Sequence, residues 1–279
     1  LTLHKAWRMA GRSVQELVLA VSEKVGLWNA WSLRCLTTLR VGGSTDPMEE
    51  LKMYPRWAQF LPHLLMMEGR GDKVGPTPTG LAGMTKGTYA KLRNKLPGRN
   101  LPEVPDSYWE EGKPDKSIDP HILRASNLYT NEIYSDYMNP KSKSYLEGFD
   151  VLPASAQDYI LSSAYNLGKD FHVDTPKKRR MPKFKAAVKS GDTYEATRQL
   201  LDTAVVGDFS SLGVAVRRGT NFNAAADSGG TPRISHIVAA DDGIKYFGEP
   251  IDGKENLIMD IPKPLHPSNK PRTVRFDGK

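Results

Sequence analysis

The sequence predicts a mainly α-helical protein of the α+β class, with a small β element near the loop at residues 69–85 and a β-prone C-terminal arm. Apolar residues recur at helical spacing up to residue 226, and Gly or Pro residues close those runs. After residue 226 the character of the sequence changes to short β-prone runs. We therefore expect three parts: a helical N-terminal region at 1–45, a main domain at 46–226 and the arm at 227–279.

The N-terminal region contains two runs of helical periodicity, at residues 1–24 and 27–39. The segment at 42–47, Gly-Gly-Ser-Thr-Asp-Pro, predicts a hinge after them. Aromatic residues on these helices favour packing over a cofactor site. We expect the region to dock the main domain onto an assembly or to pack against that domain.

A single carboxylic acid, Glu68, closes an apolar run and precedes a loop rich in Gly, Pro and Thr. The apolar residues before it have helical spacing: Trp57, Phe60, Leu61, Leu64, Leu65 and Met67. Glu68 would emerge from a packed helix into a groove shielded from water, where desolvation raises a carboxyl pKa and suits the group to donate a proton. The alternative is a polar residue that merely ends the helix.

Further helices are predicted by capping residues and apolar spacing together. Thr85 starts one of them, and Gly191 divides another stretch into two helices. The helical stretches occupy 84–96, 152–168, 184–201 and 212–218. Between the first two, five prolines at 97–125 predict an irregular surface segment in which Trp109 either stacks on a sugar ring or plugs an apolar gap.

The arm contains four β-prone runs separated by turn residues: 233–239, 244–247, 256–261 and 273–276. They predict a small sheet or an extended arm. Because the runs offer few large apolar residues, we expect another surface to order them, such as other virion subunits. A loose tail is the alternative.

Together these pieces resemble the phage-type lysozymes of glycoside hydrolase family 24 and the phage muramidases of family 108. The matching motifs are Glu68-Gly69, Gly83-Met84-Thr85, Ile133-Tyr134, Leu152-Pro153, Asn166-Leu167-Gly168, Ser190-Gly191-Asp192 and Arg217-Arg218. The resemblance covers residues 55–226. It implies a lysozyme-like fold in a phage virion or tail-associated lysin that cleaves the β-1,4 bond between N-acetylmuramic acid and N-acetylglucosamine.

The resemblance implies roles for particular side chains. Glu68 would be the catalytic acid, and Asp72 or Thr79 would stabilise charge or position water. Asp72 lies closer to Glu68 than the family pattern places its second group, and an Asp in a loop is often a turn residue instead. Thr85, Tyr89 and Asn166 would bind substrate, with Asn166 also joining its helix end to the active-site loop. For Arg217 and Arg218 we expect salt bridges at the edge of the core.

Two alternative functions remain open. The segment at 79–84, Thr-Gly-Leu-Ala-Gly-Met, is also similar to the Gly-rich loop of lytic transglycosylases, in which one Glu suffices. A structural virion or tail protein with an inactive lysozyme fold is the other alternative, because the second catalytic group is poorly defined.

The chain carries a net charge of +7 and a basic patch. The patch consists of Lys177, Lys178, Arg179, Arg180, Lys183, Lys185 and Lys189. It would attract anionic wall polymers or nucleic acid, or form a solvated loop. We do not expect a nucleic-acid partner, because no recognition helix or stacking platform is visible.

We expect no cofactor and no metal. The one cysteine, Cys35, suits a buried helix face, and the six histidines lack metal-ligand spacing. No secretory leader or membrane span is visible. The expected partners are bacterial peptidoglycan and other virion subunits, the latter through the N-terminal helices and the arm. A chain made in the host cytoplasm would act in the periplasm or cell wall from a phage virion.

Overall fold

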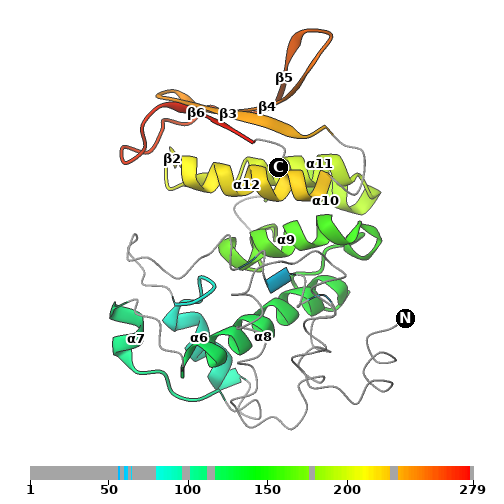
Figure 1. The fold of residues 1–279 in the computed structure, drawn as a ribbon. Coiled ribbons are helices and arrows are strands. Elements are labelled where there is room, and N and C mark those ends of the chain that lie inside the picture. The colour runs from blue at the N-terminus through cyan, green and yellow to red at the C-terminus, as the bar shows by residue number, and fades with distance from the viewer. Residues whose placement is uncertain are drawn as a thin grey trace, which may run out of the picture. The chain divides into compact units, whose positions relative to one another are not determined.

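The computed structural model describes residues 80–95, 101–111, 117–175, 180–226 and 232–276, together with Arg56, Phe60, Leu61 and Leu64. The chain divides into two compact units, Leu1–Asn131 and Glu132–Lys279, with the boundary inside helix α8 (Asp119–Met138). Figure 1 shows the elements of both units. The predicted N-terminal helices and hinge lie outside the described residues.

In the first unit, a tight turn leads into α6 (Lys86–Lys95), which confirms the helix predicted at 84–96. The structure then adds a helix that the prolines had not indicated, α7 (Asp106–Glu111). The expectation of a wholly irregular segment at 97–125 was therefore wrong. The helix forms because Tyr108 and Trp109, both less than 10% exposed, bury one side of it, and Asp106 suits its first turn.

The second unit contains the helices that follow α8, namely α9 (Ala154–Leu167), α10 (Pro182–Ser190), α11 (Thr193–Leu201) and α12 (Leu212–Ala226). The predicted break at Gly191 is confirmed, since this residue ends α10 in a left-handed conformation. Asp192 then caps α11 by accepting the backbone N–H of Glu195 at 2.9 Å. Local capping chemistry thus sets this helix boundary.

Four antiparallel strands follow the helices, in the order β5-β4-β3-β6. They are β3 (Ile234–Ala240), β4 (Gly243–Ile251), β5 (Lys254–Ile261) and β6 (Arg272–Arg275), which confirms the four β-prone runs. Figure 1 shows the sheet as one layer alongside α11 and α12, which it contacts. The described chain is therefore helix-rich and α+β, as predicted.

The sheet packs on helices of its own chain. Pairing aligns Ile237 with Tyr246 and Ala239 with Ile244 on one face, and these side chains are at most 3% exposed. The Tyr246 hydroxyl donates to the Ala215 carbonyl in α12 at 3.3 Å. The arm is thus ordered by this chain's own helices and is not a loose tail, while contact with other virion subunits stays a prediction.

Polar links fasten the sheet at two further points. The Asn223 side chain in α12 donates to the Ile234 carbonyl at 2.9 Å and accepts the Ile234 N–H at 2.7 Å. Ser210, in the two-residue ribbon β1 (Val205–Val206) and β2 (Phe209–Ser210), donates its hydroxyl to the Lys263 carbonyl at 2.9 Å. Both links satisfy backbone groups at the ends of strands.

Candidate functional site

The predicted catalytic residues Glu68, Asp72 and Thr79 lie outside the described residues. Three side chains of the apolar run before Glu68 are described: Phe60, Leu61 and Leu64 are helical and at most 1% exposed. This agrees with a packed helix that leads toward Glu68. The described part of the site begins at Gly80, the residue after Thr79.

A tight turn occupies residues 80–85. The Gly80 N–H donates to the Met84 carbonyl at 2.8 Å, and the Met84 N–H donates to the Leu81 carbonyl at 3.3 Å. The central residues, Ala82 and Gly83, have φ angles of +56° and +67°. Positive φ at both positions is the geometry of a type I′ turn, which Gly83 adopts without strain and Ala82 adopts at a cost. The end of the loop therefore has one defined shape.

Aromatic side chains from α7 support this turn. A Cβ atom added at Gly80 would lie 2.8 Å from Cε1 of Tyr108 and 3.0 Å from Cζ3 of Trp109, so only Gly permits the approach. Trp109 is 3% exposed and meets the Tyr108 ring edge-on at a centroid distance of 5.1 Å. Of its two predicted roles, the structure favours the apolar plug, which here packs beneath the turn.

Thr85 connects the turn to α6. Its hydroxyl oxygen accepts the Thr88 N–H at 3.1 Å and also bonds the Thr88 hydroxyl at 2.9 Å. Its carbonyl accepts the Tyr89 N–H at 3.0 Å. These bonds confirm Thr85 as the start of the helix. Its predicted contact with substrate stays a prediction.

Tyr89 belongs to the core of the first unit. Its side chain is 3% exposed, and its hydroxyl donates to the Pro102 carbonyl at 2.9 Å. Burial raises the pKa of Tyr89 to about 12, although the nearby Arg93 and Arg124 lower it in part. The ring packs against Trp109 at a centroid distance of 5.8 Å. The side chain is thus engaged by protein groups at both its ring and its hydroxyl.

Asn166 lies at the end of α9 and is exposed. Its amide donates to the Ser162 carbonyl at 3.0 Å, and its side-chain oxygen accepts from Arg217 in α12 at 3.1 Å. Within the second unit, Asn166 therefore links the end of α9 to α12. The predicted link to the active-site loop concerns residues of the other unit and stays a prediction.

A buried polar layer lies between α9 and α12. Arg218 is 1% exposed and donates to the Ser163 hydroxyl at 3.2 Å, while Asn221 donates to Ser162 at 3.3 Å. Burial also raises the pKa of Tyr159, one turn before Ser163, against a smaller lowering effect of Arg218. Arg218 thus belongs to the helix interface and not to the edge of the core.

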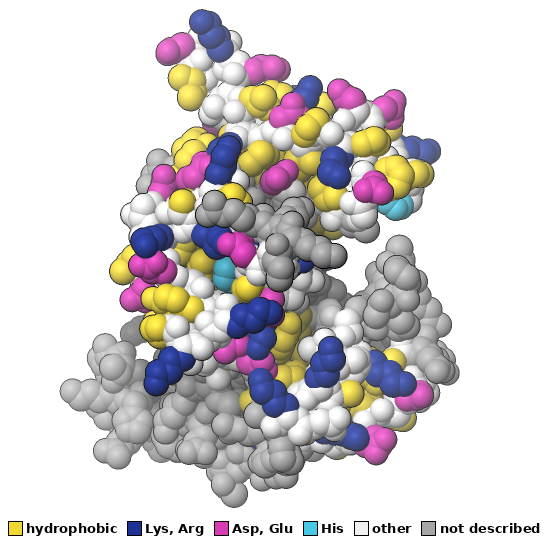
Figure 2. All heavy atoms as spheres, turned by 180° about the vertical axis from the view of Figure 1, so that it is seen from behind, with side chains coloured by type: hydrophobic (Ala, Val, Ile, Leu, Met, Phe, Trp, Pro, Cys, Tyr) yellow, Lys and Arg dark blue, Asp and Glu magenta, His cyan; other side chains and the backbone are white. Residues whose placement is uncertain are grey.

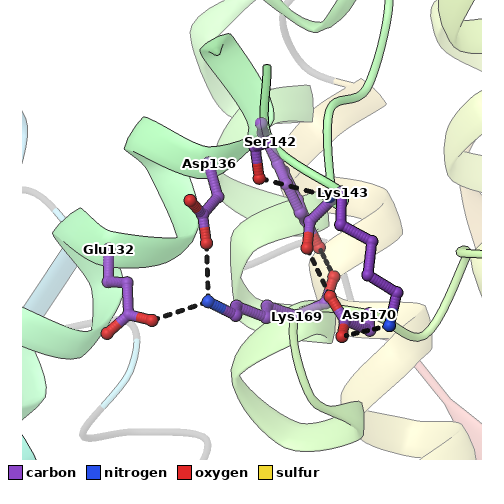
Figure 3. A network of polar contacts seen from close by, with 8 residues as sticks. Glu132, Asp136, Ser142, Lys143, Lys169 and Asp170 are labelled. Atoms are coloured by element: carbon purple, nitrogen blue, oxygen red, sulfur yellow. Dashed lines mark hydrogen bonds and ion pairs between the residues drawn. The ribbon is translucent and has the colours of Figure 1, made fainter. Parts of the chain in front are cut away.

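An ion-pair network that no sequence motif indicated joins the end of α8 to the loop after α9. The Lys169 ammonium lies between the carboxylates of Glu132 and Asp136, at 2.6 Å from each (Figure 3). Burial lowers the pKa of Lys169, but hydrogen bonds and charge from the two carboxylates outweigh this effect, so the pKa rises. The four-residue spacing of Glu132 and Asp136 placed both acids on one helix face, but their lysine partner required the fold.

The next residue, Asp170, faces a different set of groups. Its carboxylate accepts a hydrogen bond from the hydroxyl of Ser144. The same carboxylate lies 3.4 Å from the Lys143 ammonium (Figure 3). The Ser144 hydrogen bond is the main cause of its lowered pKa. Consecutive residues thus bind an acid pair on one side and a hydroxyl and an amine on the other, which fixes the loop after α9.

His172 is buried beside this network. It is 2% exposed and meets Tyr137 edge-on at a centroid distance of 5.1 Å. Desolvation lowers the pKa of His172, although backbone groups of Tyr145 and Ser144 oppose the shift. The burial of this ring in an aromatic setting therefore disfavours its charged form.

The basic patch is only partly described, since Lys177, Lys178 and Arg179 lie outside the described residues. Two of its described members are paired: Lys185 with Asp174 at 2.7 Å, and Lys189 with Glu147 at 2.9 Å. Figure 2 shows basic and acidic side chains interspersed over the face that it presents. The charge of these two lysines is therefore shared with acidic neighbours.

A hollow of about 640 Å³ lies in the first unit. Its described lining consists of Arg93, Asn94, Leu101 and Glu103. Arg93 and Glu103 approach each other to 3.6 Å, and the Glu103 side chain is 86% exposed. Within this described lining, a guanidinium, an amide and a carboxylate surround one leucine, and the carboxylate is largely exposed to solvent.

Within the described ranges, no group of three or more His, Cys, Asp and Glu side chains is placed to hold a metal ion. Among the same residues, none of the helices combines the length and apolar character needed to cross a membrane. The described residues thus supply a fixed turn and its aromatic support. The acid and its second group are predicted in the residues that precede the turn.

Over 123 residues, the chain is 32% identical to a peptidoglycan hydrolase, gp36, of Enterobacteria phage SP6. The match takes in 44% of this chain and 12% of the length of that relative. No protein-family model and no solved structure matches the chain. The chain is therefore a distant homologue of a segment of a longer phage protein.

Proposed function

We propose that this chain is a phage peptidoglycan hydrolase that cleaves the β-1,4 bond between N-acetylmuramic acid and N-acetylglucosamine. The observation that carries the proposal is the 32% identity over 123 residues to a phage peptidoglycan hydrolase. Because the match takes in 12% of that relative, the choice of bond rests on residues of this chain. These are Glu68 at the end of an apolar run and the loop that closes at Gly83, Met84 and Thr85.

Glu68 acts as the general acid. It protonates the leaving glycosidic oxygen while positive charge develops at the anomeric carbon of the sugar. A carboxyl group that donates a proton near neutral pH needs a raised pKa, which partial burial supplies. The burial of Phe60, Leu61 and Leu64 supports such a setting, since these residues belong to the same apolar run.

Asp72 or Thr79 provides the second function. In an inverting reaction, Asp72 activates a water molecule from about 6.5–9.5 Å away, whereas a nucleophile in a retaining reaction lies at about 5–5.5 Å. Thr79 is suited to orient water through its hydroxyl. The turn that follows supports either assignment, because it gives the end of the loop one fixed shape.

The site of action follows from the substrate and from the source of the relative. A peptidoglycan hydrolase from a phage works in the bacterial wall or periplasm, and we assign this chain to the virion or tail. Thr85, Tyr89 and Asn166 are retained as candidate substrate contacts. Thr85 and Tyr89 are also committed to the structure of α6, so their substitution would test fold and function together.

The experiment measures muropeptide release from purified peptidoglycan, with product masses recorded. Glu68→Gln removes the acidic proton with little change in shape, and release should fall on the order of 10²–10⁴-fold. The matched control is Glu147→Gln, because that side chain is 57% exposed and pairs only at the surface with Lys189. Asp72→Asn and Thr79→Ala then separate the two candidates for the second group.

The products distinguish this reaction from that of a lytic transglycosylase, whose 1,6-anhydro ends are lighter than reducing ends by one water. Reducing muramic ends, lost in Glu68→Gln and kept in Glu147→Gln, support the proposal. Products with 1,6-anhydro ends would instead identify the chain as a lytic transglycosylase. No release by the unmodified chain, combined with stoichiometric copies in purified particles, would instead indicate a structural virion protein.

A further inference from the structure

The Tyr108 hydroxyl joins the turn at 80–85 to the start of α8. It accepts the backbone N–H of Leu81 at 3.3 Å and donates to Oδ1 of Asp119 at 3.1 Å. Tyr108 and Asp119 are 7% and 8% exposed. A buried phenol thus uses both its donor and its acceptor capacity to connect two segments that are distant in sequence.

The ring of Tyr108 restricts the same turn by its shape. Gly80 approaches the ring so closely that a Cβ atom would collide with it. Trp109 approaches the same Cβ position of Gly80 and packs edge-on against Tyr108. Leu81 is therefore held by a directional hydrogen bond, while Gly80 packs directly against two aromatic rings.

We propose that Tyr108 is a positioning residue for peptidoglycan cleavage, acting with Asp119 to fix the end of the loop that carries Asp72 and Thr79. This inference rests on the proposed function. Thr79 is bonded directly to Gly80, and consecutive Cα atoms are about 3.8 Å apart, so a shift of Gly80 moves Thr79 with it. A displacement of about 1 Å in a catalytic group costs about 10²-fold in rate.

Asp119 completes this arrangement by orienting the phenol. With the phenolic proton directed to the carboxylate, an oxygen lone pair of Tyr108 is available for the Leu81 N–H. Loss of the hydroxyl would leave a buried backbone donor without this acceptor, and the turn would relax to find another. The predicted effect is a less well-placed loop, with substrate contacts elsewhere unchanged.

The test uses the full chain and the variant Tyr108→Phe, which keeps the ring that packs against Gly80 and Trp109. The kcat of muropeptide release should fall about tenfold, the energetic scale of one hydrogen bond, with KM changed less than about twofold. The exchange rate of the Leu81 amide proton should rise. The matched control is Tyr246→Phe, which also removes a buried hydroxyl bonded to protein but lies in the sheet of the second unit.

Variants at Asp119 separate positioning from stability. Asp119→Asn retains a side-chain oxygen that accepts the phenolic proton, so kcat should stay within about twofold of the unmodified chain. Asp119→Ala should lower kcat like Tyr108→Phe, and the double variant should be no worse than either single one, because both break the same connection. Thermal unfolding of each variant shows how much protein is folded during the assay.

The outcomes are distinct from those of the proposed function. Release that requires Glu68 but is unchanged in Tyr108→Phe would overturn the positioning role and leave the proposed function intact. Equal losses in Tyr108→Phe and Tyr246→Phe would also overturn it, since a general loss of stability would then explain both. A chain that releases no muropeptides would remove both proposals together.

Discussion

The turn at 80–85 and the helix–sheet body of the second unit are held in different ways. Besides its own two backbone hydrogen bonds, the turn depends on one tyrosine hydroxyl and on the absence of a side chain at Gly80. The body buries broad apolar faces and adds polar links between helices and strands. In the apolar layers, the free energy of folding is distributed over many contacts. The conformation of the turn, in contrast, depends on a few specific contacts. Substitutions in the body should therefore change stability, and those at the turn should change the placement of the loop.

For the stability of the second unit, the largest expected effect is at Lys169. Replacing it with Ala leaves Glu132 and Asp136 close together and partly buried without their shared cation. We expect the free energy of unfolding at pH 7 to fall by about 2 kcal/mol, the range for hydrogen bonds to charged groups. Denaturant titration of the full chain measures this quantity.

Lys143→Ala is the matched control for Lys169, because the Lys143 side chain is 74% exposed and lies 3.4 Å from its acidic partner. We expect it to change the unfolding free energy by less than about 0.5 kcal/mol. Similar losses for both variants would contradict the assignment of a structural role to the Lys169 network.

Two glycines allow a matched test of the turn. Gly80→Ala places a Cβ atom against buried rings and should cost about 1–3 kcal/mol through overpacking, with a loss of muropeptide release. Gly87→Ala meets no atom within 4 Å and lies in α6, where Ala should stabilise the helix by about 0.5 kcal/mol. In thermal unfolding, Gly80→Ala should lower the stability and Gly87→Ala should raise it, and in the release assay only Gly80→Ala should lose activity. Equal effects of the two variants would contradict the close packing at Gly80.

The smallest effect is a pH dependence that arises from His172. Desolvation lowers its folded-state pKa below the unfolded value of about 6.5, so the neutral ring contributes stability above that pH. This contribution is lost as the pH falls toward the folded-state pKa, because the unfolded chain binds a proton that the folded chain does not. Thermal unfolding between about pH 5 and 8 should become less pH-dependent in His172→Phe.

The matched control is Phe171→Leu, which alters a ring packed against His172 at a centroid distance of 5.3 Å and keeps the imidazole. The slope of stability against pH should remain unchanged in this variant. An unchanged slope in His172→Phe as well would show that His172 does not cause the dependence.

Local features were predictable where neighbouring residues decide them. Gly191 and Asp192 end one helix and cap the next through bonds that span three to five residues. Thr85 starts α6 in the same way. The four β-prone runs also became strands at nearly the expected bounds. Periodicity and caps act within a turn or two of the chain, so the sequence displays them directly.

Contacts between distant residues were not predictable. Tyr108 binds the Leu81 amide across 27 positions, and Lys169 reaches Glu132 across 37. Helix α7 was missed because its stability comes from the tertiary packing of its Tyr108 and Trp109 side chains and not from the intrinsic helix propensity of a six-residue segment. For the arm, we expected that another surface would be needed to order it. The structure shows that α12 covers the sheet, and this contact could not be inferred from the sequence of the strands alone.

The sequence by itself determined the helix-rich α+β class and the boundaries at Gly191 and Thr85, and it proposed Glu68 as the acid, which stays a prediction. Tertiary structure decided that Trp109 fills the space beneath a turn, that Arg218 lies inside a helix interface and that Lys169 joins two acids. The physical reason is the range of the interactions. Backbone conformation follows from adjacent residues, whereas burial and ion pairing depend on which distant segments the folded chain brings together.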